Sequence, residues 1–207
     1  MITVENLNLT MKKTDILKDV SVTFNEGKIY GLVGHNGCGK TMLMKCICGF
    51  VKPTSGKITV NDKVIGRDVD YIENAGIILE TPNFIPYYSG LRNLKMLAAI
   101  KNNISLQQIM DTMELCGLNP ELKRHVKKYS LGMRQRLGLA QALMEKPDIL
   151  ILDESFNGLD HDGVQDMYDI LKRFKEEGKI IIISSHSSTD IEVLCDYVYE
   201  MENGKIK

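Results

Sequence analysis

A phosphate-binding loop is the clearest chemistry in the chain. Its eight residues fit the pattern G-x-x-x-x-G-K-[ST] in full: Gly34, His35, Asn36, Gly37, Cys38, Gly39, Lys40 and Thr41. Glycines there let consecutive backbone N–H groups curl around phosphate oxygens, and a following helix N-terminus adds partial positive charge. We expect Lys40 to reach the β- and γ-phosphates of a nucleotide and Thr41 to ligate Mg²⁺. We expect His35 to serve the phosphates through its backbone, with an outward-facing ring.

Two acidic residues follow a second apolar run. Ile149–Leu152 predicts a buried strand, and Asp153 and Glu154 come directly after it. Ligands of an open parallel sheet bind beyond the carboxyl ends of its strands, where these acids would lie. We expect Asp153 to hold Mg²⁺ as the acidic partner of Thr41, and Glu154 to act as general base on the attacking water. The alternative, that the pair only caps a strand end, loses weight beside a complete phosphate loop.

His186 follows a third apolar run, Ile180–Ser184, and should emerge at the same edge of the sheet. A lone histidine is more often structural, but the convergence with the phosphate loop and the acid pair favours a contact to the γ-phosphate. His125 and His161 show no such convergence, so we expect them to be structural.

The elements that must position these residues alternate along the chain. Alternating apolar residues between positions 2 and 24 predict two or three strands at a sheet edge. Ile29–Val33 predicts a buried strand before the phosphate loop, and Gly39–Phe50 a helix after it. The last third of the chain predicts strands and helices in turn, typical of a parallel sheet with helices on its faces.

The segment from Ser89 to Glu145 carries helical signals throughout, which indicates a lobe set apart from the sheet. The predicted fold is therefore α/β: a P-loop NTPase with a mostly parallel core sheet, an N-terminal antiparallel β subdomain and an inserted α-helical subdomain. We expect one domain over 1–207, with core and β subdomain at 1–80 and 146–207 and a helical lobe at about 81–145.

Composition sets limits on the class of protein. The chain has 207 residues, a formal net charge of −1 and 43% hydrophobic residues, which favours a soluble globular protein. Its apolar runs are strand-sized, and no secretory signal is visible, so we expect a cytosolic protein. The balanced charge gives no electrostatic case for nucleic acid. Five scattered cysteines are expected to remain free thiols.

A further motif narrows the class. The segment 129–136 reads YSLGMRQR and opens a predicted helix, for which Ser130 is a suitable N-cap. It resembles the LSGGQ signature of ABC-transporter ATP-binding subunits, with Ser130 and Gly132 matching and Leu131 and Met133 differing. The order of motifs is also similar to that family: phosphate loop, helical lobe, signature, acid pair, a D-loop-like segment ending in Asp160, and a switch histidine.

The resemblance implies a composite site. In that family two ATP molecules are held in a head-to-tail dimer, so Ser130 and Gly132 would complete the site of a second copy. Asp160 would contact the other subunit, or act as a plain N-cap of the next helix. ATP and Mg²⁺ are the implied cofactors, and integral membrane permease subunits the implied partners, with the chain peripheral on the inner face of the membrane.

Three positions depart from the family pattern. Glu80 stands where a Q-loop glutamine is usual; its carboxylate could ligand Mg²⁺ or orient water, but it adds negative charge. Met11 aligns with the aromatic residue that stacks on adenine, and methionine can pack on a purine more weakly. Ser155 replaces the proline after the acid pair.

The signature variant and Glu80 together resemble the bacterial subunits that serve bacitracin- and lantibiotic-type resistance exporters. We therefore expect an ATP-hydrolysing subunit of an exporter of peptide antibiotics or similar amphiphiles. Residues 84–88 are candidates for permease docking or ordinary packing residues. The alternatives are a soluble ABC-type ATPase acting on ribosomes or nucleic acid, and a P-loop kinase, which would leave the signature and His186 unexplained.

Overall fold

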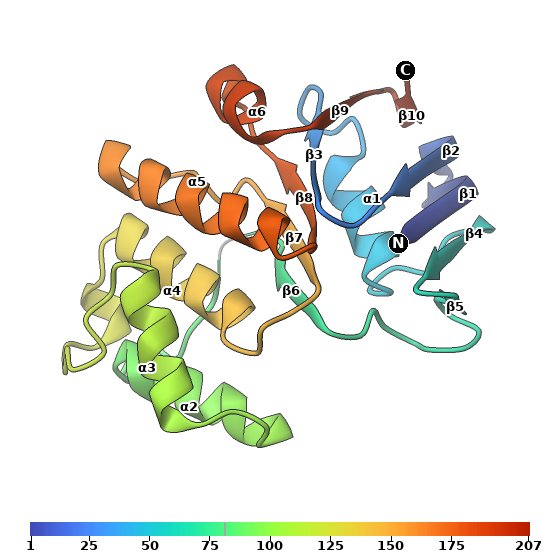
Figure 1. The fold of residues 1–207 in the computed structure, drawn as a ribbon. Helices are drawn as coiled ribbons and strands as arrows, with labels where there is room; N and C mark the ends of the chain where they lie inside the picture. Colours follow the sequence, from blue (N-terminus) through green and yellow to red (C-terminus); the bar gives the residue numbers. More distant parts are fainter. Residues whose placement is uncertain (81) are drawn as a thin grey trace.

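A six-stranded sheet forms the centre of the molecule (Figure 1). The structure is a computed structural model that describes residues 1–80 and 82–207. Strand order is β10-β9-β3-β8-β7-β6, and all neighbours are parallel except β10, which runs antiparallel to β9. The strands are β3 (Lys28–Val33), β6 (Ala75–Ile78), β7 (Ile149–Asp153), β8 (Ile180–Ser184), β9 (Tyr197–Glu202) and β10 (Lys205–Ile206). The predicted mostly parallel sheet is confirmed.

A second, antiparallel sheet has the order β2-β1-β4-β5. Its strands are β1 (Ile2–Met11), β2 (Thr14–Phe24), β4 (Ser55–Val60) and β5 (Lys63–Val64). Asn61 and Asp62 join β4 to β5 with φ values of 46° and 66°, the left-handed conformation that two-residue hairpins require. The N-terminal antiparallel β subdomain is therefore confirmed.

Helices occupy both sides of the core sheet (Figure 1). Helix α1 (Lys40–Ile47) lies between the core sheet and the antiparallel sheet, and α5 (His161–Glu176) packs on the other side near α6 (Ser188–Leu194). The inserted lobe contains α2 (Gly90–Lys101), α3 (Leu106–Leu115), the 3₁₀ turn η1 (Val126–Lys128) and α4 (Leu131–Leu143). None of the helices in the described part of the chain is long and apolar enough to cross a membrane.

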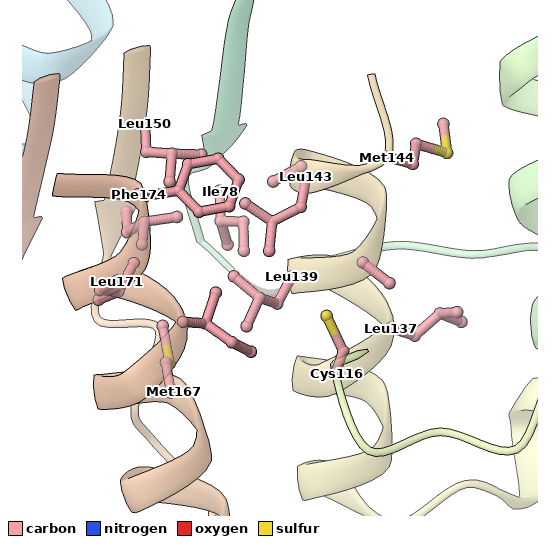
Figure 2. Close-up of a cluster of buried hydrophobic side chains, with 14 of the residues drawn as sticks. Ile78, Cys116, Leu137, Leu139, Leu143, Met144, Leu150, Met167, Leu171 and Phe174 are labelled. Carbon is pink, nitrogen blue, oxygen red and sulfur yellow. The ribbon is translucent and has the colours of Figure 1, made fainter. Parts of the chain in front are cut away.

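The buried strands divide their side chains between two cores, because successive residues of a strand point to opposite faces. Leu150, Leu152 and Ile183 pack with α4 and α5, as Figure 2 shows for Leu150 among Leu139, Leu143, Leu171 and Phe174. Ile149, Ile151 and Ile182 pack instead with α1 and the antiparallel sheet. The continuous aliphatic runs of these strands are explained by apolar layers on both faces.

Helix α4 connects the lobe to the core. It runs against β6 so closely that a Cβ on Gly76 would lie 2.2 Å from the carbonyl oxygen of Ala142. The lobe is thus held by backbone-to-backbone packing at the outer strand of the sheet. The predicted division into core and lobe at residues 80/81 and 145/146 stays a prediction.

Candidate active site

A cavity of about 300 Å³ opens where β3, β7 and β8 end. It brings together the predicted phosphate loop, acid pair and histidine, whose segments lie far apart in the sequence. Its lining residues are Ile16, Asn36, Gly37, Gly39, Lys40, Thr41, Met42, Asp153, Glu154 and His186. Residues that follow neighbouring parallel strands were expected to meet at one edge of the sheet, and they do.

The phosphate loop is curled by glycine. Gly34, Gly37 and Gly39 have φ values of 146°, 80° and 116°, and a Cβ on Gly34 would lie 2.2 Å from the carbonyl oxygen of Met201. Nζ of Lys40 reaches back over the loop and donates to the Gly34 carbonyl at 2.7 Å. His35 is exposed, as expected, and does not line the cavity. The backbone N–H groups of the loop are thus left free to face the phosphates.

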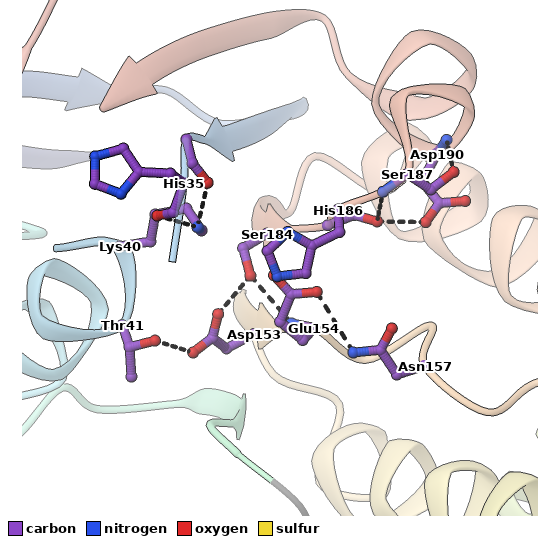
Figure 3. Close-up of polar contacts among 12 residues, drawn as sticks. His35, Lys40, Thr41, Asp153, Glu154, Asn157, Ser184, His186, Ser187 and Asp190 are labelled. Carbon is purple, nitrogen blue, oxygen red and sulfur yellow. Dashed lines mark hydrogen bonds and ion pairs between the residues drawn. The ribbon is translucent and has the colours of Figure 1, made fainter. Parts of the chain in front are cut away.

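The first acid of the pair is fixed by two hydroxyl groups. Thr41 Oγ1 donates to one carboxylate oxygen of Asp153 at 2.5 Å, and Ser184 Oγ donates to the other (Figure 3). Asp153 is 6% exposed and Ser184 is fully buried. Sequence reasoning missed Ser184: the strand pattern places it at the end of β8, but only the pairing of β8 with β7 places it beside Asp153.

The second acid faces the histidine. Glu154 Oε1 lies 3.2 Å from Nε2 of His186, and Asn157 donates to Glu154 Oε2 at 3.5 Å (Figure 3). Glu154 has φ 52°, a left-handed backbone that a non-glycine residue adopts at a cost. Its N–H donates to Ser184 Oγ at 3.1 Å, which holds this turn. Oε1 of Glu154 is buried and has no hydrogen-bond partner among the described residues. Its contact with His186 is therefore close in distance but lacks hydrogen-bond geometry.

Two predicted residues lie outside the cavity lining. Glu80 pairs with Lys45 on α1 at 2.6 Å, and this hydrogen bond lowers the pKa of the Glu80 carboxyl. Met11 ends β1 with 45% of its side chain exposed, and Ile16 lines the cavity instead. Roles for Glu80 in catalysis or metal binding, and for Met11 in base stacking, stay predictions.

The signature residues also lie outside the cavity of their own chain. Ser130 caps α4 by accepting from the N–H of Met133 at 3.1 Å, and Asp160 caps α5 by accepting from Gly163 at 2.9 Å. A Cβ on Gly132 would lie 3.0 Å from the carbonyl oxygen of Gly158. The predicted N-cap roles are confirmed, and the signature helix packs on the D-loop-like segment.

A phosphate loop, an acid pair and a histidine at the carboxyl edge of a parallel sheet define a P-loop ATPase. A profile of the family described as ABC transporter matches residues 17–157. The chain therefore belongs to the ABC transporter family, as an ATP-binding subunit with ATPase activity.

Similar proteins support this assignment. The chain is 44% identical to the uncharacterized ABC transporter ATP-binding protein YybJ of Bacillus subtilis, over 100% of this chain and 95% of that protein. It is 38% identical to the lantibiotic transport ATP-binding protein SrtF of Streptococcus pyogenes, over 100% and 89%. A solved ATP-binding subunit of an ABC transporter superposes with a TM-score of 0.89 at 26% identity, covering 100% and 88%. The resemblance to lantibiotic-type transport subunits is confirmed, and an ATPase of ribosomes or nucleic acid is not favoured.

Proposed function

We propose that this ATPase hydrolyses ATP with Glu154 as the general base and His186 as the contact to the γ-phosphate. The main support for these roles is that one cavity is lined by Lys40, Thr41, Asp153, Glu154 and His186. Glu154 would accept a proton from water, and Nε2 of His186 lies 3.2 Å from the same carboxylate. The lysine, now bonded to loop carbonyls, exchanges them for phosphate oxygens on binding.

The donors present fit a magnesium ion. Mg²⁺ in nucleotide sites takes one or two protein oxygens together with phosphates and water, and Thr41 and Asp153 offer a hydroxyl and a carboxylate 2.5 Å apart. No cluster of three or more His, Cys, Asp or Glu side chains that could hold a metal occurs in residues 1–80 and 82–207. When bound, Mg²⁺ would neutralise charge developing on the phosphates.

A second copy of the subunit would complete the site. Ser130 is exposed at the N-terminus of α4. The first backbone N–H groups of this helix could bind an anion, but this helix end does not line the cavity of its own chain. Asp160 is likewise 81% exposed. A head-to-tail dimer would place Ser130 and Gly132 of each copy over the γ-phosphate of the other.

A permease subunit is the partner proposed for the outer edge of the core sheet. A hollow of about 440 Å³ lies there between the lobe and β6, with apolar walls from Phe50, Leu97 and Ile100. Phe50 and Ile100 are 53% and 80% exposed. This edge is the docking site we propose, and residues 84–88 lie outside its lining. The chain would then act on the cytoplasmic face of the membrane.

The transported substrate is proposed to be a peptide antibiotic, because the similar protein SrtF is named as a lantibiotic transport subunit. Cells that express the chain together with its partner permease should gain tolerance to lantibiotics or bacitracin. The same cells carrying Glu154→Gln provide the control, since that variant removes the base and conserves the side-chain size. Equal tolerance with and without the transporter across a panel of such peptides would overturn the assignment of substrate.

A further inference from the structure

A buried carboxylate that the proposed reaction does not use lies behind the histidine. Asp190, on α6, is 6% exposed, and no lysine, arginine or histidine in the described part of the chain forms an ion pair with it. A buried charge must be hydrogen-bonded to be tolerated. Asp190 satisfies this requirement with two hydroxyl donors that come from different elements.

The first donor belongs to helix α5. Tyr168 donates from its hydroxyl to Asp190 Oδ1 at 2.6 Å, and both groups are buried. Burial and this hydrogen bond raise the pKa of Tyr168, so the hydroxyl stays protonated and remains a donor. The Tyr168 ring is fixed by edge packing on Phe156, with centroids 5.8 Å apart.

The second donor is next to the histidine in the chain. Ser185 donates to Asp190 Oδ2 at 2.5 Å and accepts from the N–H of Ser187 at 3.1 Å. Ser187 in turn accepts from the N–H of Asp190 at 3.3 Å. Ser185 is therefore bonded directly to the Asp190 carboxylate, and Ser187 is bonded to the Ser185 hydroxyl and to the backbone N–H of Asp190. The imidazole between them remains half-exposed toward Glu154.

We propose that Asp190 is a positioning residue for His186, and that Tyr168 and Ser185 are its two anchors. The chain of hydrogen bonds fixes the backbone that presents the imidazole to Glu154. Charge-assisted hydrogen bonds of this kind are strong and directional. The inference rests on the proposed role of His186 in hydrolysis.

The same hydrogen bonds connect His186 to the exposed N-terminus of helix α5. Tyr168 lies on helix α5, whose N-cap is Asp160, the exposed residue proposed to meet the second subunit. The inner face of α5 packs in the core. A shift of its N-terminus on dimer formation would reach His186 through Tyr168 and Asp190.

The test uses the purified full chain and two single-atom changes, Tyr168→Phe and Ser185→Ala, with Ser185→Thr as the conservative rescue. Tyr199→Phe is the matched control, because it removes a tyrosine hydroxyl that donates to the Thr23 carbonyl between β9 and β2, away from the site. We expect the first two variants to lower kcat for ATP hydrolysis at least about fivefold with KM unchanged. Ser185→Thr and Tyr199→Phe should keep the wild-type kcat.

A second readout follows His186 directly. In protein carrying isotope-labelled histidine, with the signal assigned from His186→Ala, Tyr168→Phe and Ser185→Ala should move the His186 ring resonances and Tyr199→Phe should not. Unmoved resonances together with wild-type kcat would overturn the positioning role. Moved resonances in a protein whose His186→Ala variant hydrolyses ATP normally would uphold the positioning and overturn the proposed catalytic role of His186.

Discussion

Replacing Ser184 with alanine should destabilise the protein by a predictable amount. The fully buried Ser184 hydroxyl donates to Asp153, and the alanine leaves that carboxylate oxygen without its partner. A hydrogen bond to a charged group contributes roughly 1.5–3 kcal/mol to the free energy of unfolding. The N–H of Glu154 loses one of two acceptors but keeps the Ser184 carbonyl at 3.3 Å, so it adds little. In a chain of this size each kcal/mol lowers Tm by about 2–4 °C, which gives a decrease of roughly 3–12 °C.

Calorimetry in the absence of nucleotide measures this decrease. Ser21→Ala is the matched control, since the Ser21 hydroxyl accepts a hydrogen bond from the backbone N–H of Asn6 at 2.9 Å at an exposed position of β2. Its loss should change Tm by no more than about 2 °C. A Ser184→Ala variant that melts at the same temperature as the Ser21→Ala control would contradict this prediction, because Asp153 would then need no internal partner besides Thr41.

Three further predictions concern other parts of the molecule. Glu154→Gln should lower the rate of ATP hydrolysis by about 10²–10⁴-fold with ATP affinity retained, and a wild-type rate would exclude it as the base. Gly76→Ala should lower the free energy of unfolding by about 1–3 kcal/mol, because its methyl group meets the Ala142 carbonyl; urea unfolding checks this, and an unchanged midpoint contradicts the close packing of α4. The pKa of the Asp148 carboxyl is lowered chiefly by its hydrogen bond to Lys179, so its stabilisation is present above pH 3.8 and lost as the pH falls further. Because Asp148 is 56% exposed, Asp148→Asn should cost at most about 1 kcal/mol at neutral pH and nothing in strong acid, and an equal cost at both pH values would contradict the ion pair.

Much of the fold could be predicted because local signals and packing agree. The strands β7 and β8 are unbroken aliphatic runs, and such runs occur where both faces of a sheet are covered. The N-caps Ser130 and Asp160 could be predicted from residue type and position, and each accepts the expected backbone N–H. All five cysteines are free, as expected.

The rest of the site depends on contacts that have no local signature. Pairing of Glu80 with Lys45 joins residues 35 positions apart, and no periodicity shows which cation an isolated acid will meet. Ser184 reads as one more small residue at the end of a strand, until β8 is placed beside β7. Asp190 reads as an ordinary first-turn acid of α6, and only the packing of α5 reveals its partner Tyr168.

We propose that the signature residues of a second copy complete the cavity of each chain. Sedimentation velocity of Glu154→Gln with and without ATP tests this claim most directly, since slowed hydrolysis should preserve the ATP-bound form. We expect a monomer without ATP, a dimer with ATP, and a monomer again when Ser130→Glu is added, because that carboxylate would repel the γ-phosphate. A Glu154→Gln protein that binds ATP and stays monomeric, or a dimer that Ser130→Glu leaves intact, would contradict it.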